Sequence, residues 1–296
     1  MGFFSRLFGK SRGKKKKINL PRIDINKRFE LLGRTGQGSM SKVWRARDKK
    51  LGRTVCLKIL DKEKTAKFEA RFLGLSRPME GAICTALRHK NIVQTHEYGL
   101  TLASEQYLVM ELIDGNGLNF LIETASPRLN GHRIDFLVQM AEGIDYIHKQ
   151  GFMHRDICPR NVMVTEAGLV KIIDFGLTIP NTADFHKPGN RTGTPNYLAP
   201  EVIRRINTDE RVDLFALGVT AYEMFTMHLP WEKGRSEETL KSHMNTAGRD
   251  PRDFKPGLDK AVAEFLIKSI QRNPSDRFQT AAEFRDALKA LPKQDY

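Results

Sequence analysis

Residues 154–161 read HRDICPRN, and they are followed by DFG at residues 174–176 and by APE at residues 199–201. Either triplet alone occurs by chance in unrelated proteins. The three stretches in this order are hard to obtain by accident. These residues therefore carry most of the information about the fold.

The three stretches resemble the catalytic loop, the metal-binding triplet and the activation-segment anchor of the protein kinase family. The resemblance extends from about Phe29 to about Leu291. It implies an α+β, bilobal protein kinase fold, in which a small β-rich N-lobe with one main helix precedes a larger, mainly helical C-lobe. Alternating apolar patterns early in the chain and helical periodicity later agree with this order. We expect a kinase domain at residues 28–292, with the N-lobe at 28–113 and the C-lobe at 114–292.

The chemistry that the resemblance implies needs carboxylates and an amide. Phosphoryl transfer depends mainly on holding phosphates, metal ions and the acceptor hydroxyl in line. The resemblance assigns Asp156 to orient the acceptor hydroxyl and take its proton, while Asn161 and Asp174 would supply oxygen ligands to Mg²⁺. The expected cofactors are therefore ATP and Mg²⁺. The alternative, that these three residues are only turn and cap residues, is disfavoured by the upstream sequence.

Upstream, residues 36–43 read GQGSMSKV and resemble the family's glycine-rich loop, whose backbone N–H groups approach phosphate oxygens. Ser41 stands where the third glycine of that motif is usual. Lys58 follows in an alternating apolar run that predicts a strand. In the family this lysine contacts the ATP phosphates and pairs with a glutamate on the next helix.

Two glutamates are candidates for the partner of Lys58. Residues 87–93, LRHKNIV, resemble the landmark that follows this helix in the family, and Glu80 lies nine residues before His89 in that landmark. Pro78 predicts either that the helix begins nearby or that it is mobile. Glu69 is the alternative partner, and either residue could instead be a surface glutamate.

Residues 107–113, YLVMELI, have the pattern of a buried strand. By resemblance, Met110 lies at the back of the adenine pocket and residues 111–113 form the hinge, whose backbone groups bind adenine. Apolar walls of this pocket are also ordinary core residues, so the two interpretations are compatible. The nucleotide-binding residues that the resemblance implies are Gly36, Gln37, Gly38, Ser39, Val43, Cys56, Lys58, Glu80, Met110, Glu111, Ile113 and Met163.

The catalytic loop departs from the Ser/Thr kinase pattern at Cys158, where a lysine usually contacts the transferring phosphoryl group. Arg160 lies where many tyrosine kinases carry an arginine, and it would restore a cation there. Residues 193–201, GTPNYLAPE, resemble instead the Ser/Thr version of the peptide-binding loop, with Thr194 bonded to Asp156. This loop favours Ser/Thr specificity, and dual specificity is the alternative. The expected catalytic residues are Asp156, Lys58, Arg160 and Thr194.

Three further residues are expected to support the site rather than to do chemistry. By resemblance, Asp213 lies on a buried helix and holds the backbone of the catalytic loop in place, while Arg277 pairs with Glu201.

The activation loop is a predicted site of regulation. A phosphate on Thr182 or Thr192, added by the kinase itself, would order this loop through bonds to Arg155 of the catalytic loop.

The net charge of +14 is concentrated at the N-terminus, because the first seventeen residues carry seven positive charges and no acid. We interpret residues 1–27 either as a solvated tail or as a segment that attaches to an anionic membrane surface. Arg6 disfavours myristoylation, and a nucleic-acid partner is not expected because no recognition motif accompanies the basic cluster. The three cysteines suggest no disulfide framework. We expect a cytoplasmic protein, with the inner membrane surface as the alternative location.

The expected function is therefore an ATP-dependent protein kinase that phosphorylates Ser/Thr residues of protein substrates, including its own activation loop. A pseudokinase scaffold that binds ATP without efficient transfer is disfavoured, since the lysine, both aspartates and the asparagine of the catalytic set are present. A kinase of small molecules is disfavoured because such enzymes lack a peptide platform like residues 193–201.

Overall fold

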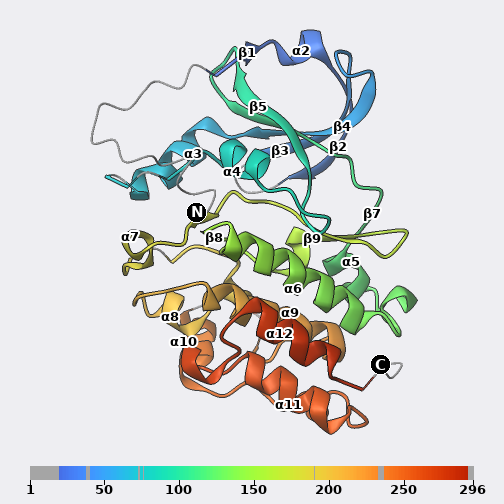
Figure 1. Ribbon diagram of the computed structural model, residues 1–296, viewed down its shortest axis with the longest axis vertical. Coiled ribbons are helices and arrows are strands. Elements are labelled where there is room, and N and C mark those ends of the chain that lie inside the picture. Colours follow the sequence, from blue (N-terminus) through green and yellow to red (C-terminus); the bar gives the residue numbers. More distant parts are fainter. Residues whose placement is uncertain are drawn as a thin grey trace. The chain divides into compact units, whose positions relative to one another are not determined.

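The computed structural model describes residues 20–37, 41–72, 74–75, 77–189, 191–232 and 237–292. Two compact units make up this part of the chain. The first contains the described residues up to His89 together with Val93–Asp114, and the second contains Lys90–Ile92 and the described residues from Gly115 onward. A β-sheet dominates the first unit and helices dominate the second (Figure 1). The predicted α+β class, with a β-rich N-lobe before a mainly helical C-lobe, is confirmed.

A six-stranded sheet in the order β1-β5-β6-β4-β3-β2 forms the body of the first unit. Its strands are β1 (Arg22–Ile23), β2 (Phe29–Gln37), β3 (Ser41–Asp48), β4 (Arg53–Leu60), β5 (Thr95–Thr101) and β6 (Gln106–Met110). Neighbouring strands are antiparallel, except that β1 and β5 are parallel. Because alternate residues of a strand point to the same face, their apolar side chains gather into one core. Its buried members are Phe29, Ala46, Val55, Leu57, Tyr107 and Val109.

The connection from β4 to β5 contains α3 (Lys62–Glu69), the 3-10 turn η1 (Ala70–Phe72) and α4 (Glu80–Ala86). Asp61 caps α3 by accepting a hydrogen bond from Lys64 N at 2.9 Å. α4 begins two residues after Pro78, which agrees with the predicted start. It packs against β5, and a Cβ at Gly81 would come within 2.4 Å of the Tyr98 ring. Only glycine therefore permits this close approach.

Residues 22–27, which we assigned to the tail at residues 1–27, are part of the first unit. β1 pairs with β5, and α2 (Ile25–Arg28) follows, with Asp24 as its N-cap. Residues 1–19 lie outside the described part of the chain. A strand of two residues carries too little hydrophobic pattern to be recognised from sequence.

Arg28, at the end of α2, explains why this segment is ordered. Its guanidinium donates to Asp48 Oδ2 at 2.8 Å and to Glu97 Oε1 at 2.6 Å, and Tyr107 Oη donates to the same Glu97 oxygen at 2.7 Å. The hydrogen bond from Arg28 is the main reason why the pKa of Glu97 lies below its usual value. This network ties α2 to β3, β5 and β6.

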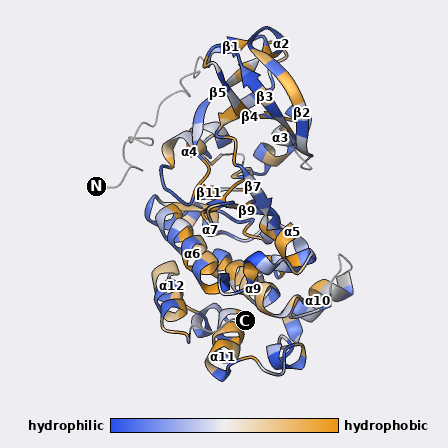
Figure 2. Ribbon diagram, turned by 90° about the vertical axis from the view of Figure 1, so that its right-hand side faces the viewer, coloured by the Kyte–Doolittle hydropathy of each residue, from blue (hydrophilic) through white to orange (hydrophobic). Residues whose placement is uncertain are grey.

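Two long helices, α6 (Arg133–Lys149) and α9 (Arg211–Thr226), pack on each other in the second unit. α12 (Ala281–Lys289) packs on α6, and α11 (Lys260–Ser269) packs on α9. Almost all of α9 is buried. α11 is amphipathic and carries both apolar and polar residues (Figure 2). The shorter α-helices are α5 (Leu118–Glu123), α7 (Ala183–His186), α8 (Pro200–Ile203) and α10 (Glu237–Asn245).

Two small sheets and several 3-10 turns complete the second unit. One sheet has the order β10-β9-β7 and the other pairs β11 with β8. The strands are β7 (Gly115–Gly117), β8 (Phe152–Met153), β9 (Val162–Thr165), β10 (Val170–Ile172) and β11 (Ile179–Pro180). The turns are η2 (Pro127–Leu129), η3 (Pro159–Asn161), η4 (Pro195–Tyr197), η5 (Pro251–Asp253) and η6 (Pro274–Asp276). Within the described ranges, no helix has both the length and the apolar composition needed to cross a membrane.

Candidate active site

Lys58 and Glu80 form the ion pair that the sequence predicts. Lys58 lies on β4, and Glu80 is the first residue of α4. Lys58 Nζ donates to Glu80 Oε1 at 2.7 Å, and both residues are 5% exposed. A buried ion pair is favourable only when its geometry is good, and this short distance meets that condition. Glu69, the alternative partner, is exposed and accepts a hydrogen bond from Gln106 instead.

The predicted glycine-rich loop joins β2 to β3. Three of its residues lie outside the described part of the chain, namely Gly38, Ser39 and Met40. Gly36 and Gln37 end β2 and pair with the start of β3, where Gly36 lies opposite Val43. Val43 lies opposite Lys58 in the next strand pair. The sheet thus brings one predicted pocket wall next to the predicted phosphate-binding lysine.

The predicted adenine-binding residues of the first unit meet at the end of β6. Met110 lies opposite Cys56 of β4, so these two predicted pocket residues are neighbours. Glu111 Oε1 accepts a hydrogen bond from Gln94 N at 2.7 Å, which engages its side chain. Ile113 lies in the segment that follows β6 and is half-buried. An adenine ring at this hinge would have to bond to backbone groups, as the sequence suggests.

Asp156 is held from two directions. Thr194 N and Oγ1 both donate to Asp156 Oδ1 at 2.8 Å, so the predicted bond between these residues is confirmed. Asn161 Nδ2 donates to Asp156 Oδ2 at 2.8 Å. Gly193 has a φ of 132°, and a Cβ there would lie 2.9 Å from Arg155 O. Glycine at this position lets the activation segment approach the catalytic loop, and the carboxylate orientation is fixed as a result.

Asn161 and Asp174 offer oxygen ligands that suit magnesium. Asn161 uses its amide nitrogen for Asp156, which leaves the amide oxygen as its ligand atom. Asp174 has a left-handed φ of 62°, and its Oδ1 accepts from Gly176 N at 3.1 Å. The described residues contain no cluster of three or more Asp, Glu, His or Cys residues for a metal. Two protein ligands nevertheless fit Mg²⁺, because substrate phosphates and water usually complete its octahedron. Met163, a predicted pocket residue, follows on β9 and is half-buried.

Asp213 of α9 anchors the catalytic loop, as the sequence predicts. Its carboxylate accepts from His154 N at 2.8 Å and from Arg155 N at 2.7 Å. His148 Nε2 lies 2.9 Å from the same carboxylate, a contact that the sequence does not predict. Burial acts to raise the pKa of the Asp213 carboxyl. The hydrogen bond with His148, the electrostatic interaction with the same imidazole and the backbone N–H of Arg155 hold that pKa below its usual value.

We expect Asp213→Asn to destabilise the second unit by about 1.5–3 kcal/mol at pH 7, because a buried charged acceptor is lost. The native pKa is depressed, so the stabilisation is present above about pH 4, the unfolded pKa, and is lost as pH falls through the native pKa. The difference in the free energy of unfolding between wild type and variant should therefore become smaller in acid. This difference is measured by urea unfolding at pH 7 and at lower pH, followed by Trp231 fluorescence in a Trp44→Phe background. A gap that widens in acid would contradict this assignment.

Cys158 and Arg160 occupy different environments in the catalytic loop. Cys158 is 1% exposed, and its Sγ lies 3.6 Å from Thr194 Oγ1. Burial raises the pKa of this thiol to about 11, and the charge of Asp156 acts in the same direction. Arg160 is exposed in η3. Cys158 is therefore a packing residue, while a role of Arg160 toward the phosphoryl group stays a prediction.

We expect iodoacetamide to label Cys158 at least roughly a hundredfold more slowly in the native chain than in urea at pH 7, because the thiolate is disfavoured and the sulfur is covered. Mass spectrometry of digests taken over time measures the rate at each cysteine. Comparable rates in the two states would show that the thiol is accessible.

Two further pairs of side chains hold the activation segment against the rest of the second unit. Arg277 Nη1 and Nη2 donate to Glu201 Oε1 and Oε2, both at 2.8 Å, which confirms the predicted pair. Tyr197 Oη donates to Glu223 Oε2 at 2.5 Å, a contact absent from the predictions. Burial is the main cause that raises the pKa of Tyr197, and the carboxylate of Glu223 adds to it. Glu223 has no recognisable motif around it, so only the fold could reveal its role.

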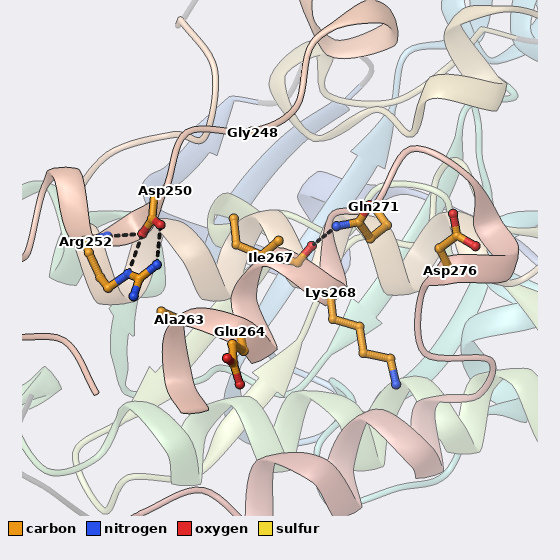
Figure 3. Close-up of a pocket in the computed structure, with 9 residues that line it drawn as sticks. All are labelled: Gly248, Asp250, Arg252, Ala263, Glu264, Ile267, Lys268, Gln271 and Asp276. Carbon is orange, nitrogen blue, oxygen red and sulfur yellow. Dashed lines mark hydrogen bonds and ion pairs between the residues drawn. The ribbon is translucent and has the colours of Figure 1, made fainter. Parts of the chain in front are cut away.

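A cavity of about 610 Å³ lies elsewhere in the second unit (Figure 3). Its lining residues are Gly248, Asp250, Arg252, Ala263, Glu264, Ile267, Lys268, Gln271 and Asp276. Its charged groups are largely paired within the chain, since Arg252 Nη2 donates to Asp250 Oδ2 at 2.6 Å (Figure 3). None of the predicted site residues lines this cavity, so it does not compete with the catalytic loop as a candidate active site.

Comparisons with known proteins show which proteins this chain is similar to. The family model described as protein kinase domain matches residues 29–289. A probable serine/threonine-protein kinase of Clostridium perfringens is 29% identical over 272 residues, which cover 91% of this chain and 39% of that protein. Serine/threonine-protein kinase PknB of Mycobacterium leprae is 30% identical over 269 residues, covering 89% of this chain and 43% of the relative. PknA of Mycobacterium tuberculosis is 30% identical over 276 residues, covering 91% and 62%. The chain thus spans less than two thirds of the length of these relatives.

Proposed function

This chain belongs to the protein kinase family, and from that premise we propose that it transfers the γ-phosphoryl group of ATP to serine and threonine hydroxyls of proteins. The observation that carries the proposal is the fixed orientation of Asp156 by Thr194 and Asn161. A carboxylate held in this way can accept a proton from an acceptor hydroxyl without first reorganising.

The roles of the remaining residues follow from their chemistry. ATP with Mg²⁺ supplies the transferable phosphoryl group and neutralises part of its charge. Lys58, oriented by Glu80, would bind phosphate oxygens, and the backbone N–H groups of the glycine-rich loop would add further donors. Asn161 and Asp174 would hold the metal ion through oxygen atoms. Arg160 would supply the cation that Cys158 cannot provide.

Serine and threonine are favoured over tyrosine as acceptors for two reasons. The segment at residues 193–201 resembles the Ser/Thr peptide-binding loop, and the relatives named above are serine/threonine-protein kinases. The chain's own activation segment is a proposed substrate, because Thr192 lines a small cavity together with Arg155 and Asp156. A phosphate on Thr192 would therefore be close to a guanidinium.

Incubation of the chain with Mg²⁺ and γ-labelled ATP, beside Asp174→Ala, tests the proposal. Mass spectrometry then maps the labelled residues on the chain and on a generic protein acceptor. Label on serine or threonine that is absent with Asp174→Ala supports it, and label on tyrosine as well would indicate dual specificity. ATP binding without any label would favour a pseudokinase scaffold and overturn the proposal.

We also propose a cytoplasmic location with peripheral attachment to an anionic membrane surface by the N-terminal tail. The support is the sequence, since the first seventeen residues carry seven cations beside large apolar residues. Sedimentation with vesicles of mixed anionic and neutral lipids, compared with neutral vesicles, tests this. Equal binding to the two vesicle types, or binding unchanged when residues 1–17 are removed, would contradict the proposal.

A further inference from the structure

α4 has little that fixes its own start. It has seven residues, and its N-cap residue Met79 makes no side-chain hydrogen bond to the helix. A helix this short gains little stability from its own backbone, so tertiary contacts must hold it. Glu80 is its first residue, and the Lys58–Glu80 ion pair therefore depends on where this turn is held.

Arg77, three residues before Glu80, is held by two aromatic rings. Its guanidinium carbon lies 4.8 Å from the Phe68 ring centroid and 5.9 Å from that of Phe72. The two rings meet edge to face with their centroids 5.3 Å apart, and they are 5% and 6% exposed. A planar guanidinium is weakly hydrated and stacks well on aromatic faces, so this site retains arginine better than lysine.

Arg77 lies three residues before Glu80 in the chain and interacts electrostatically with the Glu80 carboxylate. Burial lowers the pKa of its guanidinium, and the charges of Glu80 and then Glu69 act against that change. Glu80 thus lies in the field of two cations, with Lys58 in direct contact and Arg77 nearby. The rings of α3 and η1 position Arg77, and Arg77 in turn attracts the first residue of α4.

We propose that Arg77 is a positioning residue for phosphoryl transfer, which holds the first turn of α4 against Phe68 and Phe72 and so keeps Glu80 in place for Lys58. The proposal rests on the proposed kinase function for its catalytic consequence. Its structural part concerns only the first unit and can be tested without catalysis.

The chain offers a matched control in Arg71. Its guanidinium also lies over the Phe68 ring, at 5.9 Å, but the residue is exposed. Arg77→Met and Arg71→Met remove the same charge and the same chemical group from the same ring. A general loss of positive charge or of packing on Phe68 would affect both variants, whereas a positioning role affects Arg77→Met alone.

The first measurement is hydrogen exchange of the full chain without nucleotide, read at the α4 amides of Ile83 and Leu87, which bond to Met79 O and Ile83 O. We expect Arg77→Met to accelerate exchange there by roughly tenfold relative to β4, Arg77→Lys to recover part of the protection, and Arg71→Met to leave it unchanged. Unchanged exchange in Arg77→Met, or equal acceleration in Arg71→Met, overturns the proposal.

The second measurement is steady-state transfer to the generic acceptor. Arg77→Met should lower kcat by roughly tenfold with little change in the KM for the acceptor, and adding it to Glu80→Gln should have little further effect. Full additivity of the two changes would show that Arg77 does not act through Glu80. If the wild-type chain transfers no phosphate, the proposed function fails, and the exchange measurement still decides whether Arg77 holds α4.

Discussion

Replacing Asp156 with asparagine is expected to lower the rate of phosphoryl transfer by about 10²–10⁴-fold while ATP binding is retained. Asparagine has the same shape, and its oxygen can still accept from Thr194 N and Oγ1. It cannot take a proton from the acceptor hydroxyl, and its amide nitrogen would face Asn161 Nδ2 in place of an acceptor. The main loss should therefore appear in kcat, with a smaller loss of stability because the hydrogen bond from Asn161 is removed.

Asp184→Asn is the matched control for this change. Asp184 lies in the activation segment rather than in the catalytic loop, and it is exposed on α7 and pairs with Lys187 at the surface. Initial rates with labelled ATP, together with nucleotide titrations and thermal unfolding of both variants, separate chemistry from stability. If Asp156→Asn kept its rate within a few fold of wild type and of Asp184→Asn, the assigned role of Asp156 would be wrong.

The sequence predicts the parts of the site that lie within short motifs. Asp156 and Asn161 are five residues apart, so their relation is local and the loop sequence determines it. Glu80 is reached from a downstream landmark, although Pro78 leaves the helix start uncertain from sequence alone. The bond between Thr194 and Asp156 spans 38 residues, and only the resemblance made it predictable.

Contacts that join distant segments without a motif were not predictable. Arg28 binds Glu97 across 69 residues. The sequence contains many acidic residues, and the strand order of the sheet decides which of them lies beside Arg28. β1 has two residues and pairs in parallel with β5, so it has no periodic pattern of its own. His148 faces Asp213 because α6 packs on α9, and helix periodicity does not identify that partner. Packing between elements, rather than local propensity, decides all three contacts.

Replacing Arg277 with methionine is expected to reduce the free energy of unfolding of the second unit by about 3–5 kcal/mol, because it leaves the Glu201 carboxylate buried without its partner. The side chains of Arg277 and Glu201 are 0% and 4% exposed. Arg277 also donates from Nε to Gln271 O at 2.6 Å and lies 4.7 Å from the Phe215 ring centroid. Methionine replaces the packing of this side chain but none of its hydrogen bonds.

Arg249→Met provides the control, since Arg249 pairs with Glu232 at 3.5 Å with both side chains more than half exposed. Surface pairs of this kind contribute about 0–1 kcal/mol, so the same chemical change should have a small effect. Urea unfolding followed by Trp231 fluorescence in a Trp44→Phe background reports on the second unit, because Trp231 stacks on Phe215. Equal losses in Arg277→Met and Arg249→Met would contradict the assignment.

A double variant distinguishes the ion pair from general damage to the core. Glu201→Gln combined with Arg277→Met removes both charges, so no carboxylate is left buried without its cation. The double variant should therefore lose less stability than the sum of the two single changes, by an interaction energy of about 1–3 kcal/mol. Additive losses would mean that each residue is needed for its other contacts, such as the bonds of Arg277 to the carbonyls of Gln271 and Arg272. The activation segment would then be anchored by those backbone bonds rather than by the pairing of charges.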